Sequence, residues 1–205
     1  MSHPLYVLIA SLSIGLVGCG GGSDANSTTV AAAIPATAAG TTMPVATPTA
    51  PTTTPGFSLA PAKTCNIANF QQTLMALINQ ARASSRQCGG TAYKAVAALQ
   101  WNSRLFEAAA GHSAEMVANN YFSHTSLDGS NFGQRLSNAG YVWSAIGENI
   151  AAGPRSVDEV MTGWLNSPGH CSNIMGENFT EVGLACVSGS SSQYPSYWTM
   201  DLGRP

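Results

Sequence analysis

Charged side chains are scarce in this chain of 205 residues: eight Lys and Arg and ten Asp and Glu make up 9% of it. That is about a third of the roughly 25% found in globular proteins. The net charge of −2 argues against the basic surface by which proteins bind nucleic acid. Long hydrophobic runs are also missing, since no stretch reaches the ~20 apolar residues of a membrane-spanning helix. The sequence therefore predicts neither a nucleic-acid partner nor a transmembrane helix.

Aromatic residues are almost absent from the first 69 positions. Only Tyr6 and Phe57 lie there, and every other Trp, Tyr and Phe lies at or beyond Phe70. Because large aromatic side chains dominate hydrophobic cores, the folded part is predicted in the C-terminal two thirds. The chain length suits one domain of ordinary size and an additional segment.

The N-terminus has the pattern of an export signal. Leu5–Val17 is almost continuously apolar and ends in a small residue, although no Lys or Arg precedes it; this is too short to span a bilayer. The tetrapeptide Leu16-Val17-Gly18-Cys19 resembles the bacterial lipoprotein box. The resemblance implies a signal peptide over residues 1–18, removed before Cys19, which then carries the lipids. A secretory signal with an incidental cysteine is the alternative.

The segment after Cys19 has almost no charge and much proline. No charged residue lies between Asp24 and Lys63, and six of the eleven prolines fall between Pro35 and Pro61. Such a composition cannot bury enough apolar surface to offset its ordering entropy. We interpret residues 19–64 as a disordered tether that would lift a domain spanning residues 65–205 off a membrane surface.

Four cysteines lie within or at the start of the predicted domain: Cys65, Cys88, Cys171 and Cys186. An even number in an exported chain predicts two disulfides. Of the three pairings, we favour the two local ones, Cys65–Cys88 and Cys171–Cys186, because the first would pin the start of the domain. The lack of a Cys-x-x-Cys pair argues against zinc binding by these thiols.

Apolar spacing divides residues 65–205 into early helices and late strands. It predicts helices beginning at Phe70, after Asn102 and at Phe132, the last closed by Gly140. A capping box, Ser156-x-x-Glu159, predicts a fourth helix that ends before Pro168-Gly169. Segments 179–187 and 197–202 are rich in β-branched or aromatic residues and are typical of strands. This order indicates an α+β fold with helices packed on an antiparallel sheet.

Two histidines and one glutamate are the candidate chemical groups. His124 and His170 each follow a predicted helix, and Glu148 lies between them in the sequence. Two imidazoles and a carboxylate are an adequate ligand set for a divalent metal with an open position. The alternative is three separate polar groups at the edge of the sheet. His112 lies on the apolar stripe of the second helix and is interpreted as a core histidine.

A set of short motifs occurs in order along residues 70–203. The motifs are Leu99-Gln-Trp-Asn102, Arg104-Leu105, Ala110-Gly-His-Ser113, Met116, Phe122-Ser-His124, Gly147-Glu-Asn149, Gly163-Trp164, Ser167-Pro-Gly-His170 and Thr180-Glu-Val-Gly183. This ordered set resembles the CAP superfamily, which is also called the SCP domain, and the likeness is closest to its bacterial members. The superfamily comprises cysteine-rich secretory proteins, antigen 5 and pathogenesis-related proteins.

The resemblance implies an α-β-α sandwich with a central antiparallel sheet and a cleft lined by two histidines and acidic residues. By motif, these are His124, Glu148 and His170. Ser167 stands where many eukaryotic members have a further glutamate, and Glu181 is a candidate substitute. The histidines of related proteins can bind zinc or a similar ion. Zinc or another divalent ion at His124 and His170 is therefore the candidate cofactor, and a protein without a cofactor is the alternative.

The family's diverse functions mean that the fold alone does not define the activity. We expect a monomeric, lipid-anchored, extracytoplasmic domain of a bacterial cell envelope that binds a lipid-like or envelope ligand without catalysis. One alternative is a metal-dependent hydrolase in which His124 and His170 hold the ion and Glu148 activates its water. Another is a structural or adhesion protein. A Ser–His nucleophile pair through Ser123 or Ser167 lacks a supporting nucleophile-elbow motif.

Overall fold

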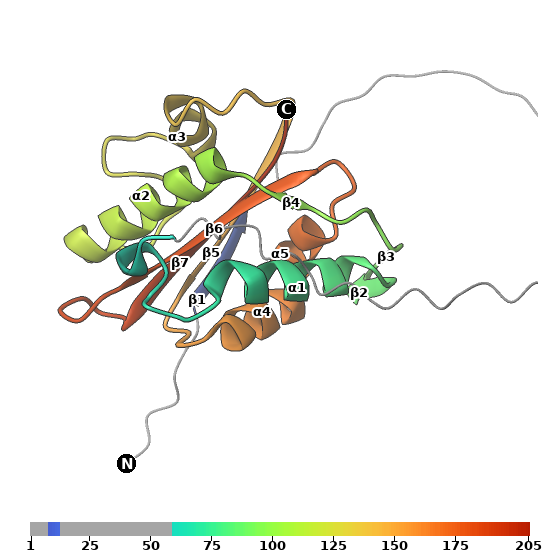
Figure 1. The fold of residues 1–205 in the computed structure, drawn as a ribbon, viewed down its shortest axis with the longest axis horizontal. Coiled ribbons are helices and arrows are strands. Elements are labelled where there is room, and N and C mark those ends of the chain that lie inside the picture. Colours follow the sequence, from blue (N-terminus) through green and yellow to red (C-terminus); the bar gives the residue numbers. More distant parts are fainter. Residues whose placement is uncertain (1–7, 13–58) are drawn as a thin grey trace, which may run out of the picture. The chain divides into compact units, whose positions relative to one another are not determined.

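The computed structural model describes residues 8–12 and 59–205 (Figure 1). The predicted lipidation site at Cys19 and the predicted tether up to residue 58 lie outside these described residues, as does most of the predicted signal peptide. The helices and strands below belong to the predicted domain, apart from one strand at residues 8–12 and a short 3₁₀ helix at residues 61–63, which lies at the end of the predicted tether.

A five-stranded sheet forms the centre of the domain, in the order β1-β5-β7-β6-β4. All neighbouring strands are antiparallel except β4 and β6, which are parallel. β1 lies within the predicted signal peptide and pairs with the edge of β5. The strands are β1 (Leu8–Leu12), β4 (Gln100–Trp101), β5 (Ala145–Ala152), β6 (Glu181–Ser188) and β7 (Ser196–Arg204), and a separate hairpin joins β2 (Arg86–Cys88) to β3 (Thr91–Tyr93).

Helices cover both faces of this sheet, so the predicted α-β-α sandwich is confirmed (Figure 1). One face carries α2 (Ser103–Asn119) and α3 (Phe132–Asn138), and the other carries α1 (Phe70–Arg82), α4 (Val157–Asn166) and α5 (Pro168–Ile174). A short 3₁₀ helix, η1, spans Pro61–Lys63. No helix in the described part of the chain is long and apolar enough to cross a bilayer.

The strand alternation explains why the sheet has two apolar faces. Successive residues of a strand point to opposite faces. On β7, Trp198, Met200 and Leu202 belong to the core beneath α1 and α4, whereas Tyr197 packs with Met116 of α2. The sheet therefore separates the protein into two cores.

Three helix starts have the side-chain caps that fix them. The Asn102 side chain accepts from the backbone of the first turn of α2, and Asn131 and Gln134 form a reciprocal capping box at α3. The predicted cap of α4 is confirmed, since the Ser156 side chain accepts from the backbone N–H of Glu159. Side chains that satisfy these free N–H groups define where each helix begins.

The favoured disulfide pairing is wrong: the structure joins Cys65 to Cys186 and Cys88 to Cys171. The chain enters the domain alongside β6, where the backbone N–H of Cys65 donates to the carbonyl of Cys186 at 2.9 Å. Residue 88 ends β2, and its hairpin packs against α5, which carries Cys171. Both bridges therefore close long loops, a relationship that sequence proximity could not reveal.

Candidate functional site

Glu148 is the centre of a buried charged cluster on the α2–α3 face of the sheet. It lies on β5 and is fully buried. Its Oε1 accepts a hydrogen bond from Nδ1 of His124 at 2.7 Å, and its Oε2 accepts one from Nη2 of Arg135 at 2.5 Å. His124 belongs to the loop between α2 and α3, and Arg135 belongs to α3. The carboxylate of Glu148 thus connects both the α2–α3 loop and α3 to the sheet.

The cluster keeps Glu148 ionised. Burial alone would raise its pKa, because it penalises the charged form. The hydrogen bond from His124 and the positive charge of Arg135 outweigh burial, and the net effect lowers the pKa of Glu148. Since the carboxylate can only accept hydrogen bonds, Nδ1 of His124 carries the proton and Nε2 faces away from Glu148.

A second carboxyl group, Asp201, lies directly across from Glu148 on β7. It is 1% exposed. Burial and then the negative charge of Glu148 raise the pKa of Asp201 well above its ordinary value. Ionisation is therefore favoured at Glu148 and disfavoured at Asp201. Within the described residues, Oδ1 of Asp201 has no hydrogen-bond partner.

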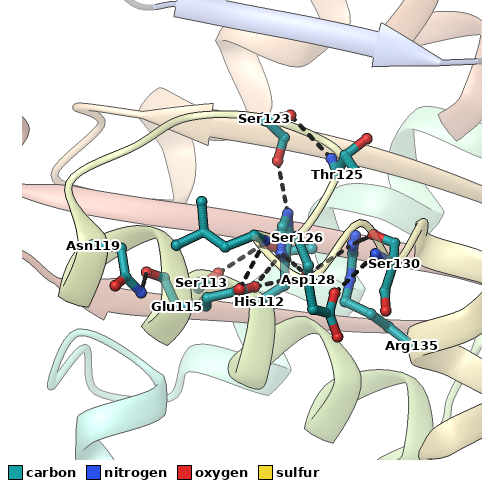
Figure 2. Close-up of polar contacts among 12 residues, drawn as sticks. His112, Ser113, Glu115, Asn119, Ser123, Thr125, Ser126, Asp128, Ser130 and Arg135 are labelled. Carbon is teal, nitrogen blue, oxygen red and sulfur yellow. Dashed lines mark hydrogen bonds and ion pairs between the residues drawn. The ribbon is translucent and has the colours of Figure 1, made fainter.

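The loop that carries His124 is held to α2 by a polar network (Figure 2). Nε2 of His112 donates to the carbonyl of Ser123 at 2.8 Å, and the Ser126 hydroxyl donates to Glu115 at 2.7 Å. Burial opposes ionisation of Glu115, yet its hydrogen bonds with Ser126 and the backbone of Leu127 lower its pKa to about 2. His112 is 1% exposed, in agreement with its interpretation as a core histidine.

His170 is not brought to His124 and Glu148. It lies on α5, and its carbonyl accepts from the side chain of Asn149 at 3.2 Å. Asn149 follows Glu148 on β5, so their side chains point to opposite faces of the sheet. His124 contacts one of these faces and α5 contacts the other, so the structure does not form the expected cleft with both histidines.

The two other predicted cleft residues also lie apart from the cluster. Ser167 is the half-buried residue between α4 and α5, in the layer of His170. Glu181 begins β6 and accepts hydrogen bonds from the Tyr141 hydroxyl at 2.8 Å and the Asn102 amide at 3.1 Å. Asn102 is the cap of α2, so Glu181 helps to fix the start of that helix.

Sequence reasoning missed Arg135 and Asp201. The sequence pattern places Arg135 only within the helix that begins at Phe132, and Asp201 only within the predicted strand at 197–202. A charged residue inside the run Tyr197–Leu202 is a signal of a buried, functional or strained position. Nothing in the sequence indicates that α3 directs Arg135 toward β5.

The donor set around Glu148 does not fit a zinc ion. Both oxygens of Glu148 already accept hydrogen bonds, and the guanidinium of Arg135 places a positive charge beside them. His170 contributes nothing here, and zinc sites use three or four protein ligands. Across residues 8–12 and 59–205, no three His, Cys, Asp or Glu side chains are grouped so as to hold a metal.

A separate groove of about 390 Å³ lies between α1 and α4. Its apolar lining comes from Leu77, Ala81, Met161 and Leu165, and its polar lining comes from Gln80, Ser84, Arg86, Asp158 and Thr162. Nε of Arg86 is buried and has no hydrogen-bond partner in the described part of the chain. The groove thus combines apolar surface with two residues of opposite charge, Arg86 and Asp158.

Comparison with known proteins defines the class. The family model of the cysteine-rich secretory protein family, CAP, matches residues 75–202, and the chain belongs to this family. An extracellular protein of Bacillus anthracis str. Ames that contains an SCP domain is 31% identical, with a TM-score of 0.53, over 65% of this chain and 40% of that one. An outer surface protein of Borrelia burgdorferi has a TM-score of 0.53 at 18% identity, over 65% and 91% of the two chains, which shows the shared fold.

Two proteins of Bacillus subtilis (strain 168) are similar in sequence. The uncharacterized protein YkwD is 38% identical over 94 residues, which are 45% of this chain and 36% of YkwD. The uncharacterized membrane protein YlbC is 38% identical over 93 residues, 43% of this chain and 26% of YlbC. The chain thus matches about a third or less of either relative.

Proposed function

We propose that the protein is an extracytoplasmic, lipid-anchored CAP domain that binds an amphiphilic envelope ligand and does not catalyse its conversion. The observation that carries this proposal is the groove between α1 and α4. Its volume of about 390 Å³ lies within the range of small-molecule sites, ~300–1,000 Å³. Our proposal therefore assigns the ligand to the groove and not to the cleft predicted at His124, Glu148 and His170.

The lining of the groove suggests the chemistry of the ligand. Leu77, Met161 and Leu165 offer apolar surface for an acyl chain. Arg86 lines the groove with its guanidinium, and guanidinium groups bind carboxylates and phosphates well. The ligand class is therefore an amphiphile with an apolar chain and an anionic head.

Three features support an envelope location. The tetrapeptide ending at Cys19 resembles a lipoprotein box, and two disulfides are typical of proteins outside the cytoplasm. Two structural relatives are described as an extracellular protein and an outer surface protein. Substitution Cys19→Ser should abolish lipidation. Mass spectrometry of the N-terminal peptide and detergent partitioning test this, and unchanged partitioning would contradict the lipid anchor.

The Glu148 cluster supports binding over hydrolysis. A hydrolytic glutamate must be free to take a proton from water. Here Arg135 and His124 occupy both oxygens of Glu148, and the pKa of Glu148 is lowered, which makes it a weak base. The cluster therefore acts in this proposal as a structural fastening between the helices and the sheet.

A pair of probes with the same chain and opposite heads tests the groove. Decanoate should displace a fluorescent fatty acid from the purified protein, and decyltrimethylammonium should do so more weakly. Arg86→Gln should remove most of this preference for the anion, and Met161→Trp should reduce binding of both probes by filling the groove. Arg155→Gln is the matched control, because Arg155 is exposed and does not line the groove. If neither probe binds, or if Met161→Trp has no effect, the proposal fails and a structural or adhesion role becomes the better explanation.

A further inference from the structure

Arg135 of the short helix α3 is largely buried and makes an unusually large number of polar contacts. Its side chain is only 10% exposed. Besides Glu148, it reaches three oxygens of the loop that carries His124: Nη1 donates to the carbonyl of His124 at 3.0 Å, the carbonyl of Ser130 at 3.3 Å and the hydroxyl of Ser126 at 3.4 Å. Figure 2 shows Ser126 and Ser130 beside this side chain.

These contacts have the pattern of a cation bound by oxygen ligands. One carboxylate comes from the sheet, and two carbonyls and a hydroxyl come from the loop. Divalent cations in proteins commonly gather oxygens in this way from segments distant in sequence. The planar guanidinium of Arg135, with five donors, can likewise bind oxygens from distant segments, and it does so as part of the chain.

Among the charged groups around Glu148, the guanidinium of Arg135 is the one that neutralises its negative charge. His112 and Glu115 of α2 face the cluster from one side, and Asp201 faces it from β7. Arg135 supplies the one permanent positive charge in contact with Glu148 among the described residues. A divalent ion at Glu148 would meet this charge at short range, and like charges repel strongly where water is excluded.

We infer that the guanidinium of Arg135 is the built-in counter-charge of Glu148. It occupies the position that a divalent metal ion would need in order to bind Glu148. Arg135 is thereby a positioning residue for His124 and its loop. This inference is independent of the groove and of any ligand bound there.

The inference predicts what remains when the guanidinium is removed. Arg135→Met leaves the buried carboxylate of Glu148 without its counter-charge, next to the imidazole of His124 and the carboxyl group of Asp201. The three groups, all within the described residues, are not arranged to hold a metal in the natural protein, so Asp201 has to turn toward Glu148 and His124 to complete the three protein ligands of a zinc site with an open position. The substitution should therefore create a divalent-cation site that the natural protein lacks.

Equilibrium dialysis of the full-length protein in detergent against Zn²⁺ at pH 7.5 tests this, with Tm measured with and without zinc. The natural protein should bind no zinc that depends on His124, and zinc should not change its Tm. Arg135→Met should have a lower Tm, bind about one equivalent of zinc and regain part of the lost Tm when zinc is added. Arg135→Met/His124→Ala should lose this zinc, and Arg135→Lys, which keeps the positive charge, should not gain it. Arg104→Met, at an exposed arginine of α2, is the matched control and should behave like the natural protein.

The opposite results are equally clear. One equivalent of zinc in the natural protein that His124→Ala removes would show that a metal displaces Arg135, and would overturn the inference. If Arg135→Met does not fold, Arg135→Met/Glu148→Gln decides the matter, because it removes the unpaired carboxylate as well. A clear recovery of folding in this double variant, without zinc, supports charge balance as the role of Arg135. No recovery would overturn it.

Discussion

Glu148 and Asp201 are register partners on β5 and β7, buried side by side, and their pKa values shift in opposite directions, that of Glu148 down and that of Asp201 up. Because burial and the negative charge of Glu148 raise the pKa of Asp201 in the folded state, the native protein holds this proton to a higher pH than the unfolded chain does. Stability associated with this group is therefore fully present below the ordinary carboxyl range and falls as the pH rises toward the raised pKa.

The first prediction concerns this proton. Asp201→Asn keeps a donor toward Glu148 and removes the titration, so its Tm should exceed that of the natural protein at pH 8, and the difference should disappear near pH 4. Thermal unfolding across this range measures it. Asp201→Leu, which has no donor, should not match Asn at pH 8. A constant difference between Asp201→Asn and the natural protein at every pH would contradict a protonated Asp201.

The second prediction separates the two disulfides. The loops they close span 121 and 83 residues, so each bridge should stabilise the domain by up to about 5 kcal/mol. Peptide mapping without reduction should recover Cys65 linked to Cys186 and Cys88 linked to Cys171. The variant Cys88→Ala/Cys171→Ala frees the hairpin that carries Arg86, and it should weaken binding of decanoate in the groove.

The variant Cys65→Ala/Cys186→Ala is the control for the groove. It should lose comparable stability while keeping the affinity for decanoate at temperatures where it is folded. Equal loss of affinity in both double variants would mean that the hairpin has no specific role in the groove.

The sequence predicted the helices better than it predicted the pairing of the strands. The stripe beginning at Phe70 and the cap at Ser156 are local signals, and both helices form as expected. β5 was not identified, because Gly147, Glu148 and Asn149 are poor strand formers in isolation. Their strand is formed by pairing with β7, more than 40 residues later in the chain.

The candidate site was predicted only in part for the same reason. His124 and Glu148 do come together, as their motifs implied. His170 was assigned to the same cleft although α5 packs on the opposite face of the sheet, because a motif carries no information about faces. Arg135 became visible only in three dimensions, since its four partners lie on a loop and a strand brought together by folding.

The third prediction concerns the packing of α2 on the sheet. A Cβ atom added to Gly183 of β6 would lie 2.0 Å from the backbone nitrogen of Phe106 and 2.4 Å from the carbonyl carbon of Leu105. Backbone cannot move as a side chain tip can, so Gly183→Ala should destabilise by about 3 kcal/mol or more. Gly111→Ala, in α2 with nothing within 4 Å, should instead stabilise by ~0.5–1 kcal/mol. Urea unfolding measures both, and similar effects at the two positions would contradict the close approach of α2 and β6.

The fourth prediction concerns Arg82, which is 1% exposed at the end of α1. Its Nε donates to the carbonyl of Ala97 at 2.7 Å, and Nη1 donates to those of Ile174 and Gly176 at 2.7 and 2.9 Å. Nη2 donates to the carbonyl of Phe179 at 3.3 Å. Burial lowers the pKa of Arg82 to about 10, which still leaves it charged at neutral pH.

Arg82 therefore supplies donors to the connection between α5 and β6. Arg82→Ala would leave several carbonyls without partners, each at a cost of about 1–3 kcal/mol where water cannot reach, so the expected loss is on the order of 3–5 kcal/mol. Arg82→Lys should lose less, because an ammonium with three donors can serve some of these carbonyls. Urea unfolding at pH 7 measures the losses, and Arg155→Ala, at an exposed position, should stay within about 0.5 kcal/mol of the natural protein. Hydrogen exchange in residues 174–180 should accelerate most in Arg82→Ala. A loss below about 1 kcal/mol would show that water or other groups satisfy these carbonyls and that Arg82 does not hold the connection.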